Sequence, residues 1–167
     1  EQAAFDVYDA NNINPLYGFF VARAGLGASE SMRSKLAEYN DPRLSRAFIT
    51  KQGTSGKEQA PGTADNAVYA PNGTPEQGTS KYGTSLFMYS ISAPTLLLSY
   101  HELKFLEAEA LCRLERDAKS ALKDAVVAGL LNAENSFTIS RKELGKTLIN
   151  AASSITEAEA ESYFDNT

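Results

Sequence analysis

The residues best suited to chemistry gather in one short stretch, where the chain's single histidine, His101, precedes Glu102, Glu107 and Glu109. A zinc peptidase helix of the HExxH type needs a second histidine four residues after the first, so that both imidazoles reach one metal ion. That position is Phe105. One histidine and one cysteine cannot supply three strong nitrogen or sulfur ligands, and a carboxylate-only site would favour calcium or magnesium. We therefore expect no bound metal and no cofactor.

Paired carboxylates are the other chemistry that this stretch could offer. A glycoside hydrolase needs two carboxyl groups that face each other across a cleft. Glu107 and Glu109 are two residues apart, so on a helix they point in different directions. The sequence therefore predicts no catalytic residues.

The same stretch has the pattern of an ordinary helix. Ser99 and Glu102 form an S-x-x-E capping box at its start, which places His101 in an exposed first turn. Apolar residues then recur at steps of three and four, which predicts a well-buried helix from about 100 to 115. Its inward residues would be Leu103, Leu106, Ala110 and Leu114, widened by Phe105, Ala108 and Cys112. Cys112 is then a small buried hydrophobic residue.

Further helices surround this one. A tight break at 115–117 leads into a helix over 118–131, capped by Asp117, and the short connection predicts an antiparallel hairpin. Its inward residues would be Ala121, Leu122, Ala125, Val126 and Leu130. Two more capping boxes predict helices that begin at Ser140 and Thr156, the first burying Leu144, Leu148 and Ala151. A short helix over 29–39 ends at Asn40-Asp41-Pro42, where Asp41 and Arg43 would stabilise the turn.

The fold class predicted is all-α, with tetratricopeptide-like helical hairpins and long irregular loops, although no consensus repeats at a 34-residue period. We divide the single unit 1–167 into a loop and short helix (1–52), a Gly/Pro/Asn-rich loop (53–98) and helical hairpins (99–167). Within the loop, Gly53 to Gly83 lacks an apolar face, and its tyrosines suggest an ordered segment over the helices.

Composition limits the partners. The net charge is −5 and the pI is near 5.0, and no cluster of Lys and Arg is present, so nucleic acid and anionic lipid are disfavoured. No apolar run of about 18 residues exists that could span a membrane. The chain begins at Glu1 without a signal-like segment, so we expect any targeting sequence to have been removed.

Three segments in order resemble a known family. They are NPLYGFF (14–20), EYNDPRL (38–44) and, after a Gly/Pro/Asn-rich interval, APTLLLSYHELKFLEAEALCR (93–113). This order resembles the SusD/RagB family, particularly its SusD-like lipoprotein branch. Its members have a similar asparagine-aspartate-proline-arginine segment, followed later by a proline, an apolar stretch, a tyrosine-x-glutamate and a helix rich in alanine and glutamate.

The resemblance implies an outward-facing outer-membrane lipoprotein of Bacteroidetes-type bacteria. Such a protein captures glycans or other small nutrients without catalysis and covers a TonB-dependent SusC-like transporter. It also implies a tetratricopeptide-like scaffold with a ligand surface built from loops. Family members are several times longer, so the resemblance predicts an internal fragment, attached to the membrane only through a lipid anchor that this chain lacks.

Loop aromatics and amides are the candidate ligand-binding residues, because rings stack on the apolar faces of sugars and amides bind their hydroxyls. The candidates are Tyr69, Tyr82, Asn66, Asn72 and Tyr17, of which Tyr17 lies in apolar company that also suits a core position. The alternative function is a helical protein–protein interaction module with no carbohydrate ligand.

Overall fold

The structure, a computed structural model, describes residues 3–5, 7–22, 27–52, 57–61, 69–73, 84–87, 90–144 and 153–167. Helices carry most of this part of the chain: α1 (Pro15–Ala22), α2 (Glu30–Glu38), α3 (Tyr100–Arg113), α4 (Lys119–Leu144) and α5 (Glu157–Asn166). Short strands join them: β1 (Ala3–Phe5), β2 (Phe48–Gln52), β3 (Lys57–Pro61), β4 (Thr84–Ser85) and β5 (Thr95–Leu98). The fold is predominantly helical, as predicted. The sequence did not indicate the strands.

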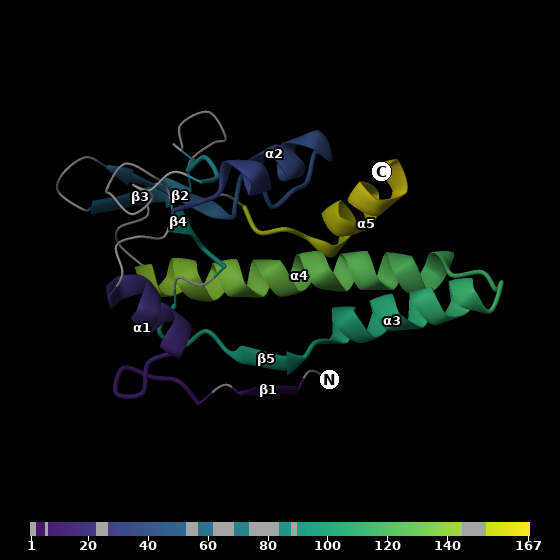
Figure 1. The fold of residues 1–167 in the computed structure, drawn as a ribbon, viewed down its shortest axis with the longest axis horizontal. Coiled ribbons are helices and arrows are strands. Elements are labelled where there is room, and N and C mark those ends of the chain that lie inside the picture. Colours follow the sequence, from purple (N-terminus) through teal and green to yellow (C-terminus); the bar gives the residue numbers. More distant parts are fainter. Residues whose placement is uncertain are drawn as a thin grey trace.

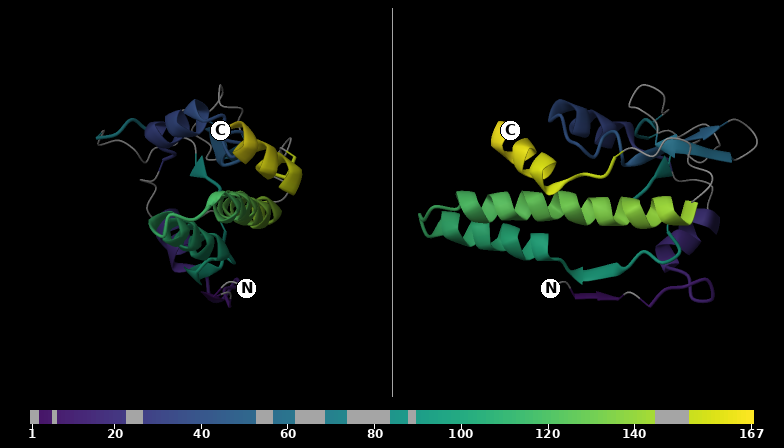
Figure 2. Two further views of the ribbon diagram at one scale, coloured as in Figure 1. Left: turned by 90° about the vertical axis from the view of Figure 1, so that its right-hand side faces the viewer. Right: turned by 180° about the vertical axis from the view of Figure 1, so that it is seen from behind.

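The long helix α4 is the central layer of the molecule (Figure 1). On one side of it lie α3 and the antiparallel pair β1–β5; on the other lie α2, α5 and the three-stranded antiparallel sheet β3-β2-β4. The views from the end and from behind show the same order (Figure 2). Both outer layers therefore lie against α4, which fixes their positions relative to each other.

The capping box at the start of α3 is confirmed. The hydroxyl of Ser99, 1% exposed, accepts a hydrogen bond from the Glu102 amide at 3.2 Å, and Glu102 Oε2 accepts from the Ser99 amide at 2.8 Å. Ser99 Oγ also donates to Glu102 Oε2 at 2.6 Å. These hydrogen bonds from Ser99 hold the pKa of Glu102 below its ordinary value of 4.5. The carboxylate contribution is therefore present above pH 4.5 and is lost as the pH falls through the lowered pKa.

Ser99→Ala is expected to lower the free energy of unfolding by about 1 kcal/mol, because an N-terminal amide of α3 loses its acceptor. Ser120→Ala, an exposed serine in the first turn of α4, should change it by less than about 0.5 kcal/mol. Urea denaturation of both variants measures the difference. Equal midpoints would show that the box contributes nothing to stability.

The helix α4 is longer than predicted. The sequence suggested an end at 131 and a new helix at Ser140, but α4 runs unbroken from Lys119 to Leu144. The buried Ser140 caps nothing, because its hydroxyl instead donates to the carbonyl of Leu86 at 2.7 Å. That bond satisfies the hydroxyl inside a continuous helix. The helix predicted to begin at Ser140 was expected to bury Leu144, Leu148 and Ala151, but these three side chains lie outside the described part of the chain.

The main core lies between α4 and the layer of α2, β2 and α5. Phe137 and Phe48 are almost completely buried there, and the ring of Phe87 packs edge-on to Phe137 at 4.7 Å between centroids. The other buried members are Ala28, Leu36, Ala47, Leu86, Leu130, Ala133, Ile155 and Ala160. The confirmed N-cap of α5, Thr156, accepts from the Glu159 amide at 3.2 Å and orients α5 on this core.

The predicted inward face of α3 is wrong. Leu103, Leu106 and Leu114 are 51%, 58% and 64% exposed, and Cys112 is exposed rather than buried. Instead α3 meets α4 through small side chains: Ala108 is buried on α3, and Ala121 and Ala125 on α4. Small residues let two helices approach closely, so the larger ones are left outside. Leu122 on α4, also expected to face inward, is 40% exposed.

The turn after α2 is as expected. The guanidinium of Arg43 donates to both carboxylate oxygens of Asp41, at 2.9 and 2.6 Å, and Asp41 is buried. Hydrogen bonding to Asp41 raises the pKa of Arg43 above its ordinary value, against the lowering effect of burial. Asp41 also accepts from the Arg43 amide at 2.9 Å, so the pair stabilises the turn, as predicted.

Candidate ligand-binding site

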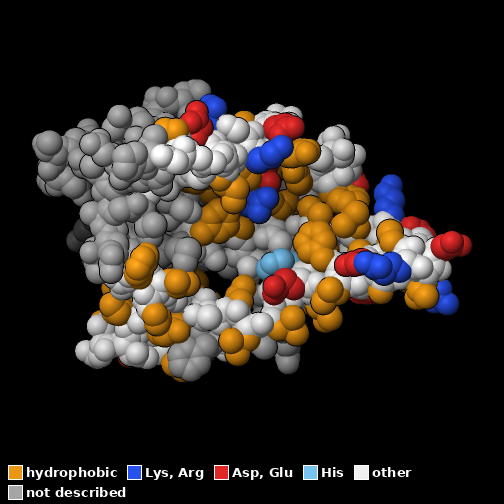
Figure 3. All heavy atoms as spheres, viewed as in Figure 1, with side chains coloured by type: hydrophobic (Ala, Val, Ile, Leu, Met, Phe, Trp, Pro, Cys, Tyr) orange, Lys and Arg blue, Asp and Glu red, His pale blue; other side chains and the backbone are white. Residues whose placement is uncertain are grey.

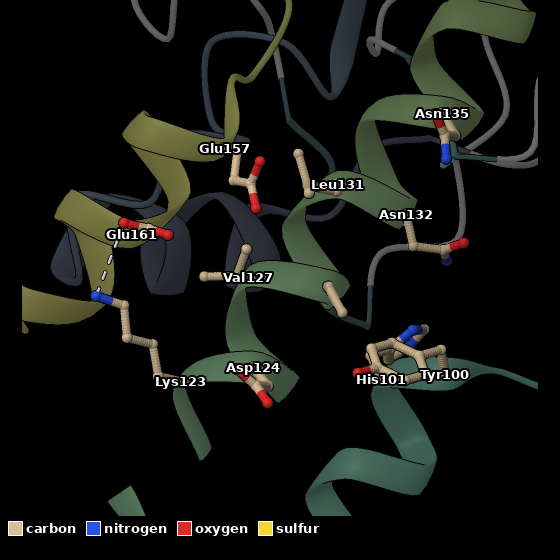
Figure 4. Close-up of a pocket in the computed structure, with 11 residues that line it drawn as sticks. Tyr100, His101, Lys123, Asp124, Val127, Leu131, Asn132, Asn135, Glu157 and Glu161 are labelled. Carbon is tan, nitrogen blue, oxygen red and sulfur yellow. Dashed lines mark ion pairs between the residues drawn. The ribbon is translucent and has the colours of Figure 1, made fainter. Parts of the chain in front are cut away.

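A cavity of about 440 Å³ opens between the start of α3, the middle of α4 and the first two turns of α5 (Figure 4). This volume lies within the range of about 300 to 1,000 Å³ that is common for small-molecule sites. Its polar lining comes from three helices, and its apolar lining from α4 alone. The lining residues are Tyr100, His101, Lys123, Asp124, Val127, Ala128, Leu131, Asn132, Asn135, Glu157 and Glu161.

The first turn of α3 places an aromatic ring and an imidazole at the cavity. Tyr100 is 40% exposed, which leaves a ring that a ligand can contact. His101 is half-buried rather than exposed as expected, since its ring packs against Gly129, where an added Cβ would lie 3.9 Å from the ring atoms. Residues 100 and 101 are adjacent and directly follow the cap at Ser99, so the box that starts α3 also orients this wall.

The tautomer of His101 follows from its neighbour. Ser99 Oγ gives its proton to Glu102, so toward the imidazole Nε2 at 3.2 Å it can only accept. The proton of the neutral ring is then on Nε2, and Nδ1 is an acceptor. Among the described residues Nδ1 is buried and has no hydrogen-bond partner.

Two asparagines divide the cavity from a second one. Asn132 and Asn135 also line a neighbouring cavity of about 370 Å³, whose other walls include Pro94, Leu96 and Ser136. Within the described part of the chain, neither amide side chain makes a hydrogen bond. The two cavities therefore lie next to each other along α4, and together we call them the groove; the pair of amides between them can both donate and accept.

The charged groups of the groove are largely paired with each other or with its rim. Lys123 lies 3.0 Å from Asp165 and 3.9 Å from Glu161, and the hydrogen bond to Asp165 raises its pKa. Asp124 lies 3.3 Å from Lys104. Carboxylates outnumber cations among the lining residues, so an anionic ligand is disfavoured and a neutral one is not.

The groove offers no arrangement for metal chemistry. Among residues that the structure describes, no group of three or more His, Cys, Asp or Glu side chains is placed to hold a metal ion. Glu157 and Glu161 are four residues apart on α5 and so lie on one face of one helix. Two such carboxylates stand side by side and cannot flank a bond from opposite sides.

The candidates named from the sequence lie elsewhere. Tyr69 is half-buried and packs edge-on to Phe48 at 5.3 Å between ring centroids. The guanidinium of Arg33 lies over the Tyr69 ring, 5.8 Å from its centroid. Asn72 is exposed and donates to Ser31 Oγ at 2.8 Å. Tyr17 is half-buried on α1. Asn66 and Tyr82 lie outside the described residues.

The groove residues were missed by the sequence reasoning. The signal was present on α4, where Ala128, Leu131, Asn132 and Asn135 follow the spacing of a buried stripe but end in two amides. Amides at apolar-stripe positions indicate a polar surface inside a packed layer. Tyr100, Glu157 and Glu161 had no such pattern, because helices distant in sequence bring them together.

Comparisons with known proteins agree with this description. Residues 1–135 match the profile of a SusD-like family described as starch-binding and associating with the outer membrane. The crystal structure of a SusD/RagB family protein from Bacteroides thetaiotaomicron is 60% identical over 99% of this chain, with a TM-score of 0.89. This chain spans 35% of that protein. A search of curated proteins found no match to the present chain.

Proposed function

The chain belongs to the SusD/RagB family, and from this premise we propose that it is part of a protein that binds neutral glycans at the outer membrane without cleaving them. The bound glycan would pass to a TonB-dependent SusC-like transporter for import. The protein would face outward, held by a lipid anchor outside this chain. None of the helices in the described part is both long and apolar enough to cross a bilayer.

The groove along α4 is the observation that carries this proposal. It combines a half-exposed aromatic ring, Tyr100, with the amides of Asn132 and Asn135 and an apolar wall that includes Val127 and Leu131. Rings and apolar walls contact the C–H faces of sugars, while amides bind hydroxyls in either direction. Two neighbouring cavities suit a short linear oligosaccharide better than a single sugar.

The arrangement of acidic groups supports binding without hydrolysis. Glu157 and Glu161 share one helix face, and Asp124 is paired with Lys104. Glycoside cleavage needs an acid and a base or nucleophile on opposite sides of the bond. The bound oligosaccharide should therefore be recovered unchanged after prolonged incubation with the protein, as chromatography of the ligand would show.

Binding is tested by isothermal titration of the whole polypeptide with maltohexaose, a neutral linear α-glucan. Tyr100→Ala and the double variant Asn132→Ala/Asn135→Ala are each expected to raise Kd about tenfold or more, which corresponds to about 1.4 kcal/mol. Ser120→Ala, outside the groove on the same helix, is the matched control and should leave Kd unchanged.

The loop of residues 53–83 is the second candidate surface in the same assay. If Tyr69→Ala/Tyr82→Ala or Asn66→Ala/Asn72→Ala weakens binding while the groove variants do not, the ligand surface is the loop, and Tyr17→Ala extends the test to α1. Unchanged binding in all groove variants would contradict the assignment to α4. No detectable binding of any neutral glycan would contradict the proposed function.

A further inference from the structure

The outward face of α3 is an apolar stripe with no partner among the described residues. Leu103, Leu106 and Leu114 are all more than half exposed, and Ala110, also exposed, lies between them in the stripe. Their spacing of three, four and four residues puts them on one side of the helix. The strand that leads into α3 adds Leu97, which is 73% exposed. Hydrophobic side chains gather along this part of the surface in the space-filling view (Figure 3).

This stripe faces away from α4. The side of α3 that packs on α4 holds the buried Ala108 and the half-buried Leu111. Helical geometry places Leu106 and Ala110 on the far side from Ala108, at roughly 160 degrees from it. The leucines are therefore not part of the contact between α3 and α4. A contiguous apolar surface of this kind marks a contact with other polypeptide.

The charges beside the stripe do not select a charged partner. Glu109 pairs with Arg113 at 2.6 Å and Glu107 with Lys104 at 2.9 Å, both on the same helix, while Glu102 accepts from Ser99 at 2.6 Å. The leucines lie between charged groups that already have partners within α3 or at its cap. Such a surface is complementary to another apolar surface, such as a helix face, and offers little to a strongly charged partner.

The length of the family protein indicates what covers the stripe. The Bacteroides thetaiotaomicron protein contains the whole of this fold with a TM-score of 0.89, yet this chain spans only 35% of it. About two thirds of such a polypeptide therefore lies outside the fold described above. That remainder is tethered to this part, so its effective concentration at the stripe exceeds that of any separate molecule.

We propose that the leucine stripe of α3 is an internal interface, covered in the whole polypeptide by residues of the same chain beyond 1–167. The covering segment presents apolar side chains, and α3 is then a buried helix. A second copy of the chain or the transporter would be a different occupant, and the test below separates the three.

Thiol labelling of the whole polypeptide tests the interface. In a Cys112→Ser background, Leu103→Cys and Leu106→Cys are each treated with a maleimide, and Ser120→Cys, exposed on α4, is the control. With a covering segment from the same chain, both leucine-site thiols should react about tenfold or more slowly than the control, because labelling requires local opening. Light scattering establishes that the sample is monomeric.

The other outcomes overturn the proposal. Labelling as fast as the control means that nothing covers the stripe; protection that disappears when a dimer is diluted to monomer assigns it to a second copy. Protection that requires the transporter assigns it to that partner. Hydroxyl-radical footprinting of the unsubstituted monomer repeats the measurement without mutations. If Leu103 and Leu106 are oxidised as fast as leucines of the unfolded chain, the proposal is contradicted as well.

Discussion

Phe137→Ala is expected to lower the free energy of unfolding by about 3 to 5 kcal/mol. The ring of Phe137 is 0% exposed at the centre of the core, where α4 meets β2 and the segment around Phe87. Truncation removes both the burial of the ring and its edge-on contact with Phe87. It also leaves a cavity that α4, fixed by its neighbours on both sides, cannot close.

Guanidinium denaturation of the whole polypeptide measures this loss, with Lys142→Ala as the control. Lys142 is exposed on the same helix, and its removal should cost less than about 0.5 kcal/mol. If the two variants unfold at the same denaturant concentration, Phe137 is not a core residue and the position of α4 on the sheet is wrong.

The second large effect is expected at Glu134, which is 6% exposed and joins two parts of the chain. Its carboxylate pairs with Arg141 and accepts hydrogen bonds from Thr138 Oγ1 and from the Ile155 amide, each at 3.0 Å. Glu134→Ala leaves Arg141, whose side chain is only 10% exposed, without its charge partner. Removing one member of a buried ion pair costs about 3 to 5 kcal/mol.

The exposed pair on α3 is the matched control. Glu109 and Arg113 are also a glutamate and an arginine on one helix, but their side chains are 56% and 76% exposed. Glu109→Ala should cost about 0 to 1 kcal/mol. The double variant Glu134→Leu/Arg141→Met should recover much of the loss, since apolar replacements leave no buried charge. Equal losses at Glu134 and Glu109 in thermal unfolding would contradict the buried network.

Local signals in the sequence predicted the helix starts well. The capping box at Ser99 and the N-cap bond of Thr156 act through atoms only three residues apart. The box predicted at Thr156 is only half formed, because the Glu159 carboxylate instead accepts from Arg46, 113 residues away. The same pattern failed at Ser140, because the carbonyl of Leu86, 54 residues away, takes its hydroxyl. A capping box is therefore reliable where its serine is free to cap, and the sequence does not reveal a distant competitor.

The inward face of α3 was assigned wrongly for a physical reason. Periodicity shows that a helix has an apolar side, but it does not show which side meets a given neighbour. On α3 the leucines form the stripe, yet Ala108 forms the contact with α4, because Ala121 and Ala125 allow a close approach there. The strands were missed because β3 and β4 lie in a segment rich in turn residues, where pairing with β2 outweighs local preference.

The groove could be predicted only in part. The amides of Asn132 and Asn135 stand out within an apolar stripe, and their spacing is visible in the sequence. Their proximity to Tyr100 and to Glu157 depends on how α3 and α5 pack on α4, which no local pattern specifies. The family resemblance indicated a glycan-binding protein with a ligand surface built from loops. On the loop Tyr69 packs against Phe48, and ligand binding there stays a prediction.

Arg46 binds residues that are synthesised long after it. Its guanidinium, almost buried beside the turn at Pro42, donates to the carbonyl of Ser153 at 2.6 Å and to Glu159 at 3.0 Å. These partners are 107 and 113 residues later in the chain. At about 5 to 20 residues per second of translation, Arg46 is synthesised roughly 6 to 23 s before Glu159. Throughout that interval the guanidinium has only local partners such as the Pro42 carbonyl at 2.7 Å, and its bonds to Ser153 and Glu159 form only after those residues are synthesised.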